Sequence, residues 1–478
     1  MRSCVILAIG LSLLAAKDAR GDEIILKNGR RIAALSVEVQ GDRVRYVTSA
    51  GELTLPKSIV DHIEKGGMAQ MPVSAAQGAA NLAITPSSIE PTGPKTAAES
   101  GAVHDGAVDR EFLATLTGDA RSGAAGANDK AALGYYAAAQ FELSRGDMEH
   151  ALTDQRTALT YAPENPILLL NMAYLHLRRS EYKQALEYLE RAQRVAPENP
   201  DVPKLTGWAY YGMNKLNQAV AEWQHALRLR PDAEVQAALE KAQRDKQEEE
   251  TYRENESSHF TLKYSGAAEP ALAREVLRAL ETHFAAIESE LNYTPPEPIG
   301  VILYTQQAFA DITSAPGWVG ALNDGRIRVP VQGLTQLTPA LSLVLKHELT
   351  HSFVRQKTRA AAPTWMQEGL AQWMEGKRSR VSAPVLLRVY DAKQAMSLKD
   401  LEGSWMGLSN DVAAYAYAWA LANIECIVQS DGMNDVQRIL DRVAAGTSTE
   451  LAVREVLHSD YGDLGQATAE YLRKAYGN

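Results

Sequence analysis

The chain has 478 residues, of which 45% are hydrophobic and 23% charged, and a net charge of −10. This length is too great for one ordinary domain and predicts about three, at roughly 150 residues each. The acidic balance argues against a nucleic-acid-binding protein, because neutralising phosphates requires a basic face. We interpret the charge as a contribution to solubility.

The first residues have the features of an export signal. The short basic start Met1-Arg2-Ser3 precedes the apolar stretch Cys4–Ala16, which is too short to cross a bilayer comfortably. We therefore predict a signal peptide over residues 1–21 and a periplasmic or secreted bacterial protein, with an uncleaved anchor or a buried helix as the alternative. No later segment is apolar enough to cross a membrane, so we expect no stable membrane span after cleavage. Removal of Cys4 would leave Cys426 as the remaining cysteine, and its apolar surroundings predict a buried thiol.

Two segments of different character follow. Residues 22–65 alternate as short strands between Gly-containing turns, which predicts a small β-barrel-like module. The module resembles those found near the start of exported bacterial proteins. Residues 66–128 are rich in Ala, Pro, Ser, Gly and Thr, and we predict a disordered linker because such a segment buries too little surface to offset its chain entropy. A short helix around residues 109–117 is compatible with this prediction.

The next segment, residues 129–254, repeats with a period of 34. Pro163, Pro197 and Pro231 are spaced by 34 residues (197 − 163 and 231 − 197). Small residues recur at the same interval, where two helices cross: Ala139, Ala173 and Gly207. This pattern resembles the tetratricopeptide repeat (TPR) and implies an α-helical solenoid that binds a protein partner or substrate. The polar segment 230–254 then predicts a capping helix.

Residues 255–478 alternate between strand and helix patterns and predict an α+β domain. Strands are expected over 259–264 and 299–304, and a helix over 270–291. Asn323-Asp324-Gly325 predicts the turn of a hairpin. Thr338-Pro339 then begins a long helix, with an N-cap residue followed by proline in the first turn.

The long helix contains the motif His347-Glu348-Leu349-Thr350-His351. Residues four apart lie on one helical face, so the two imidazoles can hold one metal ion. Glu348 can reach the open side of that metal without being a ligand, and can take a proton from a metal-bound water.

A further acidic residue completes the set. Glu368 lies 17 residues after His351 (368 − 351), within Trp365-Met366-Gln367-Glu368-Gly369-Leu370-Ala371. The two motifs together resemble the gluzincin zinc metallopeptidases, and the repeats followed by this segment look like bacterial proteins with a peptidase MA-like domain. The resemblance implies one Zn²⁺ per chain held by His347, His351 and Glu368, with Glu348 as general base and a peptide or protein as substrate.

The same resemblance implies two further features. An oxyanion donor is expected beyond the third ligand, and Tyr417 is our first choice and Tyr415 the second, with an aromatic ring packed in the core as the alternative for either. The segment Gly320–Asp324 would be an edge strand that holds the substrate backbone, with an ordinary exposed edge as the alternative. Apart from the resemblance, Gln372 lies one turn after Glu368, and we expect it to orient a ligand histidine. His259, His283 and His458 are isolated in the sequence and are expected to be structural or solvated.

The sequence thus predicts a multidomain protein with a small N-terminal all-β module, an α-helical TPR solenoid and a C-terminal α+β gluzincin metallopeptidase domain. The predicted function is an exported zinc metallopeptidase. The alternative is a scaffold, either non-catalytic or gated by a partner that binds the repeats. An intact base at Glu348 argues against the non-catalytic scaffold, because a structural zinc site does not require that residue.

Overall fold

The computed structural model describes residues 20–27, 31–34, 36–48, 51–69, 96–145, 147–264, 270–305, 321–323, 325–331, 334–405 and 408–477. Residues 1–19 of the predicted signal peptide (residues 1–21) lie outside this range, and its last two residues, Arg20 and Gly21, begin the first strand. Within the described residues, no helix combines the length and apolar character needed to cross a bilayer.

The N-terminal module consists of two antiparallel three-stranded sheets, as expected for a small all-β unit. One sheet has the order β2-β1-β6 and the other the order β3-β4-β5. Val37 N donates to the carboxylate of Asp22 at 2.9 Å, which joins the two sheets. Alternating apolar residues, among them Ile24, Val37 and Val44, form the core. The strands are β1 (Arg20–Leu26), β2 (Arg31–Ala34), β3 (Ser36–Gln40), β4 (Arg43–Thr48), β5 (Gly51–Pro56) and β6 (Val60–Ala69).

The prediction of a disordered linker over 66–128 is wrong for residues 66–69, which belong to strand β6, and for residues 96–128, while residues 70–95 lie outside the described range. Three short elements and a helix occupy the segment: α2 (Ala97–Gly101), β7 (Val103–His104), β8 (Ala107–Val108) and α3 (Arg110–Arg121). Leu113 and Leu116 of α3 are buried against the first repeat helix, in one cluster with Ala131. The average composition of the segment concealed these few well-placed apolar residues. Thr96 also begins α2 with a capping box.

The repeat region is a stack of antiparallel helix pairs, which confirms the TPR prediction. Each pair has a short turn, and the small residues lie where the helices cross. A Cβ added to Gly207 would lie 2.4 Å from the indole nitrogen of Trp223. The pairs are α4 (Ala127–Ser144) with α5 (Met148–Tyr161), α6 (Pro166–Arg178) with α7 (Tyr182–Val195), and α8 (Asp201–Gly212) with α9 (Leu216–Leu229), and the single helix α10 (Ala233–Glu249) packs on α9.

The C-terminal domain is α+β, as predicted. Its sheet has the order β12-β13-β11-β10-β9, with three parallel strands in the centre and an antiparallel strand at each edge. The strands are β9 (Arg253–Glu256), β10 (Phe260–Tyr264), β11 (Ile299–Tyr304), β12 (Leu322–Asn323) and β13 (Ile327–Pro330). Around them lie α11 (Pro270–Leu291), α13 (Pro339–Lys357), α14 (Thr364–Glu375), α15 (Ala383–Asp391), α16 (Asn410–Ser430), α17 (Met433–Ala444), α18 (Thr449–Leu457) and α19 (Tyr461–Tyr476).

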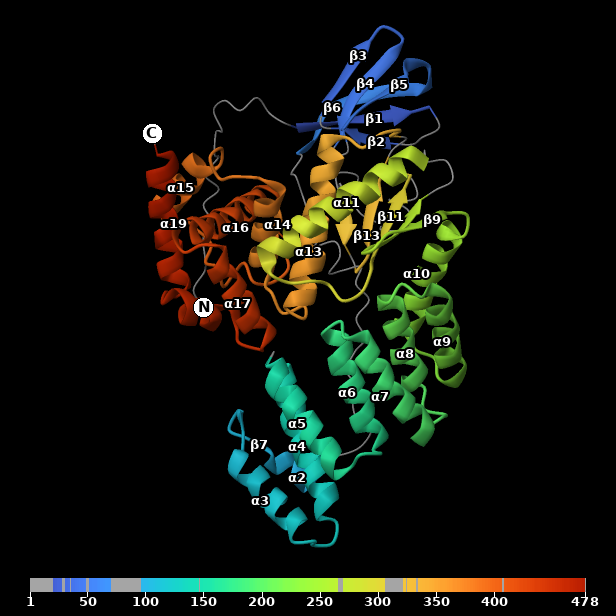
Figure 1. The fold of residues 1–478 in the computed structure, drawn as a ribbon, viewed down its shortest axis with the longest axis vertical. Helices are drawn as coiled ribbons and strands as arrows, with labels where there is room; N and C mark the ends of the chain where they lie inside the picture. The colour runs from blue at the N-terminus through green and yellow to red at the C-terminus, as the bar shows by residue number, and fades with distance from the viewer. Residues whose placement is uncertain are drawn as a thin grey trace, which may run out of the picture.

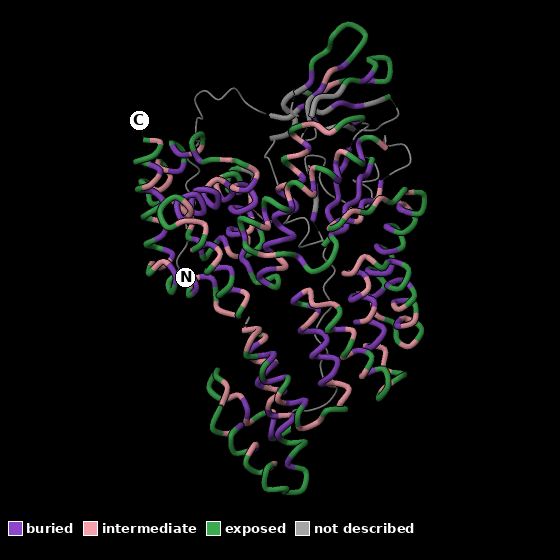
Figure 2. The backbone as a smooth tube through the Cα atoms, viewed as in Figure 1, coloured by how far each residue is buried: buried purple, intermediate pink, exposed green. Residues whose placement is uncertain are grey.

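The helices α11 and α13 pack beside this sheet, and the remaining helices extend the domain away from the sheet (Figure 1). One apolar core joins the sheet to α11, α13, α14, α16 and α17. Figure 2 shows this interior and the facing sides of the repeat helices as buried backbone. Cys426 of α16 is buried, as its sequence context predicts.

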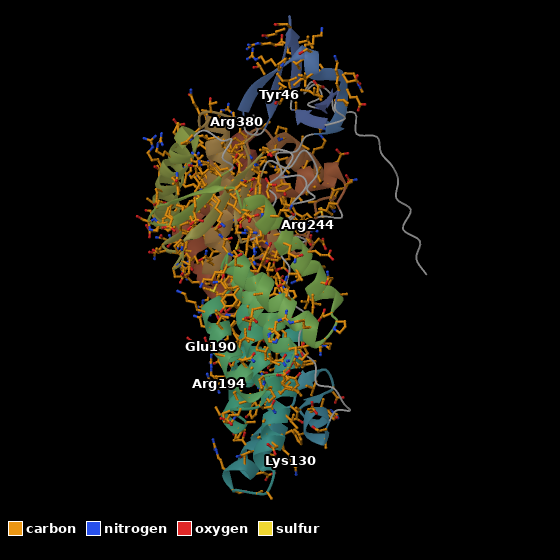
Figure 3. All side chains as sticks on the ribbon, turned by 90° about the vertical axis from the view of Figure 1, so that its right-hand side faces the viewer. Tyr46, Lys130, Glu190, Arg194, Arg244 and Arg380 are labelled. Carbon is orange, nitrogen blue, oxygen red and sulfur yellow. The ribbon has the colours of Figure 1, made fainter. Side chains whose placement is uncertain are left out.

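The three parts form an elongated molecule. The β module, with Tyr46, lies at one end, and the first repeat, with Lys130, lies at the other (Figure 3). Strand β5 contacts α13, so the module rests on the helix that carries the histidine motif.

Candidate metal centre

Helix α13 begins where the sequence predicts and holds the motif rigidly. The hydroxyl of Thr338 accepts from Leu341 N at 3.1 Å, and Pro339 occupies the first turn. Leu345, Leu349 and Phe353 are fully buried in the core of the domain. This packing fixes the rotation of the helix about its axis, and therefore the direction of the face that carries both histidines.

The structure brings His347, His351 and Glu368 together. Their ligand atoms all lie within 4.8 Å of one another, and all three side chains are buried. Nε2 of His347 lies 3.6 Å from Oε2 of Glu368, and Nε2 of His351 lies 3.8 Å from the same oxygen. Ligands about 2.0–2.1 Å from a tetrahedral zinc are about 3.3 Å apart, so small side-chain shifts would complete the site. The donor set fits a zinc ion.

Gly369 allows α14 to pack closely enough against α16 to place Glu368 at this site. A Cβ added to Gly369 would lie 2.6 Å from the carbonyl oxygen of Ala420 and 2.6 Å from Cγ1 of Ile424. The backbones of α14 and α16 can therefore approach closely only because residue 369 has no side chain. This contact places Glu368 toward α13 and brings Tyr417 of α16 near the site.

A carboxylate that the sequence analysis missed supports His347. Nδ1 of His347 donates to Oε2 of Glu375 at 3.0 Å, and Lys377 Nζ lies 2.9 Å from the same oxygen. Glu375 follows Glu368 by two helical turns (375 − 368 = 7), so both project from one face of α14. That spacing was the available signal in the sequence. Ligand histidines commonly donate their second ring nitrogen to such a carboxylate.

The electrostatics of the two histidines differ. Burial lowers the pKa of His347, but the carboxylates of Glu368 and Glu375 next to its ring outweigh burial and raise the pKa to about 9. Burial and the charge of His347 together lower the pKa of His351 well below its ordinary value. Metal ligation uses the neutral imidazole, so the extra proton must leave His347 before it can bind a cation.

The prediction that Gln372 orients a ligand histidine is wrong. Its amide donates to the carbonyl oxygens of Glu368, at 3.1 Å, and Tyr417, at 3.0 Å. The side chain therefore joins α14 to α16. It is Glu375, one turn further along α14, that contacts the histidine.

The two candidate tyrosines point in different directions. Burial raises the pKa of Tyr417 well above its ordinary value, and the nearby charges of Glu368 and Glu348 raise it further. Its ring packs edge-on against Trp405, with centroids 5.0 Å apart. The ring of Tyr415 instead stacks on Trp419 at 6.2 Å, on another side of α16. Only Tyr417 shares the electrostatic environment of the metal centre.

Strand β12 lies at the edge of the sheet beside α13. It pairs with β13 alone among the described strands. Nδ2 of Asn323 donates to the carbonyl oxygen of Glu348 at 2.8 Å and to Oγ of Ser352 at 2.7 Å. The edge is thus fixed to the turn of α13 that carries the motif. Gly320 and Asp324, which complete the predicted edge segment, lie outside the described residues.

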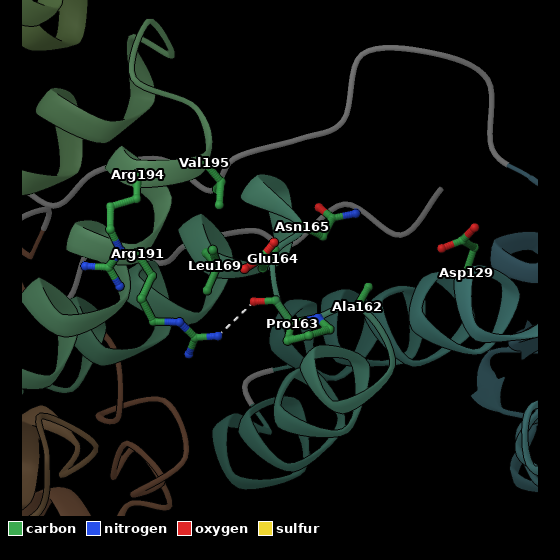
Figure 4. Close-up of a pocket in the computed structure, with 9 residues that line it drawn as sticks. All are labelled: Asp129, Ala162, Pro163, Glu164, Asn165, Leu169, Arg191, Arg194 and Val195. Carbon is green, nitrogen blue, oxygen red and sulfur yellow. Dashed lines mark hydrogen bonds between the residues drawn. The ribbon is translucent and has the colours of Figure 1, made fainter.

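Other histidines and the repeat cavity lie apart from this centre. Nδ1 of His259 pairs with Glu281 at 2.7 Å, and Nε2 of His283 contacts Ser342 Oγ at 2.9 Å. A cavity of about 530 Å³ lies in the repeat region (Figure 4). There Arg191 donates to the carbonyl oxygen of Pro163 at 2.8 Å. Acidic and basic side chains both line it: Asp129, Glu164, Arg191 and Arg194.

Comparisons with known families identify the repeat region and the C-terminal domain. Residues 290–474 match the model described as the Peptidase MA superfamily, and residues 177–242 match the tetratricopeptide repeat model. The chain therefore combines a TPR region with a C-terminal peptidase MA superfamily domain. The matched peptidase segment contains His347, Glu348, His351, Glu368 and Tyr417.

Similar solved structures are TPR domains. The Arabidopsis OM64 TPR domain is 19% identical, with a TM-score of 0.24, over 24% of this chain and 96% of that chain. The first TPR domain of human RPAP3 is 21% identical, with a TM-score of 0.23, over 23% of this chain and 89% of that chain. No curated protein matches the chain.

Proposed function

We propose that the chain is an exported zinc-dependent metallopeptidase in which His347, His351 and Glu368 hold one zinc ion. The observation that carries this proposal is the convergence of two imidazole nitrogens and one carboxylate oxygen at a buried point of the peptidase MA superfamily domain. Two histidines and one carboxylate leave a fourth tetrahedral position open, as in catalytic rather than structural zinc sites.

The chemistry is the hydrolysis of a peptide bond. A zinc ion supplies Lewis acidity, which lowers the pKa of a bound water to about 7 and polarises the substrate carbonyl. Glu348, buried beside the ligands, accepts the proton of the attacking water and passes it to the leaving amine. Glu348 directly follows His347, so its side chain projects from α13 about 100° around the helix axis from that of His347. The carboxylate therefore lies away from the ligand positions.

Tyr417 supplies the hydrogen bond to the oxyanion. A tyrosine hydroxyl is protonated at neutral pH, and the raised pKa of Tyr417 keeps it so at higher pH as well, so the group can donate as negative charge develops on the carbonyl oxygen. Its proximity to Glu348 and Glu368 supports this role over Tyr415.

The substrate is a peptide or protein that pairs with strand β12. Backbone pairing at a sheet edge gives affinity without a strict sequence requirement. The TPR repeats recruit a protein partner or the substrate itself, as stacked helical repeats do. The predicted signal peptide, residues 1–21, supports a periplasmic or secreted location.

A second candidate is a scaffold whose peptidase domain is inactive, or becomes active only when a partner binds the repeats. The extensive repeat region favours it. The presence of Glu348 favours the enzyme, because metal binding alone does not require that carboxylate.

The test is cleavage of a mixed peptide library by the chain lacking residues 1–21, with products identified by mass spectrometry. We expect cleavage that a chelator stops and that one equivalent of zinc restores. New internal ends identify an endopeptidase, and successive loss of terminal residues identifies an exopeptidase. A zinc-loaded chain that cleaves nothing would support the scaffold or the partner-gated enzyme.

A further inference from the structure

The last repeat helix is joined to the sheet of the peptidase domain by buried charges. Asp245 of α10 and Arg328 of β13 are both 0% exposed, and Arg326 is 3% exposed. The carboxylate of Asp245 accepts from Arg326 Nη2 at 2.5 Å and from Arg328 Nη2 at 2.8 Å. Glu249, also in α10, accepts from Arg326 Nη1 at 2.9 Å. A buried guanidinium that loses such partners is strongly destabilised, so β13 and α10 must move together.

Arg326 also contacts the turn between α8 and α9. Its Nη1 donates to Oδ1 of Asn214 at 2.9 Å. Asn214 has a φ of 59°, in the left-handed region that asparagine and glycine tolerate. One side chain of the peptidase domain therefore contacts both a turn and a helix of the repeat region.

The same hairpin reaches the metal centre. Arg326 directly precedes β13, and in the β12–β13 pair Leu322 lies opposite Arg328 and Asn323 opposite Ile327. Asn323 is the residue whose side chain donates to the carbonyl oxygen of Glu348. Three consecutive contacts thus lead from α10 through the hairpin to the backbone of the general base. In contrast, the metal ligands lie on α13 and α14.

We propose that Arg326 is a positioning residue through which the repeat region sets the substrate-binding edge, β12, relative to Glu348. A protein partner that displaces α10 or the α8–α9 turn would then change substrate binding and turnover while leaving zinc affinity unchanged. This inference rests on the proposed peptidase function and adds a route for its regulation.

The least disruptive substitution that tests the proposal is Asn214→Gly in the full mature chain. Glycine keeps the positive φ and removes only the acceptor for Arg326. The matched control is Ser180→Gly, because Ser180 lies 34 residues earlier at the equivalent turn with a φ of 58°. Hydrogen exchange is measured at residues 322–323 and 327–329, together with kcat, KM and zinc affinity by competition with a chelator.

We expect Asn214→Gly to speed exchange in the hairpin by about tenfold, the effect of one lost hydrogen bond to a charged group. We expect KM to rise by a similar factor, the zinc affinity to stay within about twofold, and Ser180→Gly to change nothing. Asp245→Asn, which removes the negative charge that both arginines share, should speed exchange by at least about 100-fold.

Unchanged hairpin exchange in folded Asn214→Gly and Asp245→Asn chains would overturn the proposal. So would an equal loss of zinc affinity, which would indicate general destabilisation of the domain. If Asp245→Asn does not fold, Asn214→Gly decides alone. Because hydrogen exchange requires no turnover, a native chain that cleaves nothing would contradict a peptidase that acts without a partner and leave this test of coupling intact.

Discussion

Nδ1 of His347 donates to the Glu375 carboxylate at 3.0 Å, while Nε2 of the same ring faces Glu368 at 3.6 Å. The contact with Glu375 fixes which ring nitrogen carries the proton and therefore which one can bind a metal. Lys377 in turn lies 2.9 Å from the Glu375 oxygen that accepts this bond. Glu375 and Lys377 thus support the metal centre from the side of α14.

Replacing Glu375 by alanine should lower zinc affinity by about 10- to 100-fold, because His347 loses the group that orients it. Glu375→Gln keeps a carbonyl acceptor and should lose less. Lys377→Met, which leaves the contact with His347 in place, should have the smallest effect. Competition with a chelator measures all three, and native affinity in Glu375→Ala would show that the contact is incidental.

Tyr417→Phe should reduce kcat by roughly 10²- to 10³-fold with little change in KM, as expected for loss of one oxyanion donor. Zinc content should remain native. Tyr415→Phe serves as the control, because its ring stacks on Trp419 and should keep nearly full activity. Equal effects of the two substitutions would remove the catalytic role of Tyr417.

Gly369→Ala should lower the free energy of unfolding of the peptidase domain by about 1–3 kcal/mol, because the new methyl group meets the backbone of α16. Zinc affinity should fall as well, since α14 carries Glu368. Gly465→Ala in α19 is the matched control. Its Cβ would meet only Trp419 at 3.9 Å, and the change should stabilise the helix by about 0.5–1 kcal/mol. Denaturant unfolding followed by circular dichroism distinguishes the two, and equal stability would contradict the close packing of α14 on α16.

The first repeat should lose stability as pH rises from about 4.5 to about 7. Burial and the charge of Asp154 raise the pKa of Glu142 to about 7, despite the nearby cations Arg110 and His150. A carboxyl group with a raised pKa stabilises the fold fully below its unfolded pKa, and this stabilisation is lost as pH rises through the folded pKa. Glu142→Gln should flatten the dependence of melting temperature on pH in this range. An equal slope in both chains would contradict the assignment.

The sequence predicts the parts whose signals are periodic or carry their own chemistry. The 34-residue spacing of Pro163, Pro197 and Pro231 and the motif around His347 are local patterns, and both correspond to structure. The ordered elements over 97–121 were predicted only in part, as a short helix around 109–117 that corresponds to α3, because a few apolar residues in a polar segment leave a weak average signal.

The supporting contacts of the site depend on tertiary structure. Glu375 and Gln372 share one helix with Glu368, and only the packing of α14 between α13 and α16 decides which of them contacts His347. The ion pairs between Asp245 and Arg326 join residues 81 positions apart (326 − 245), a distance that no local pattern encodes.

The most direct test of the account compares the native mature chain with Glu348→Gln for zinc content and peptide cleavage. Glu348 is proposed to move protons and not to bind the metal, so both chains should hold one zinc ion and only the native chain should cleave the library. Cleavage at native rates by Glu348→Gln, or no zinc in either chain, would contradict the account.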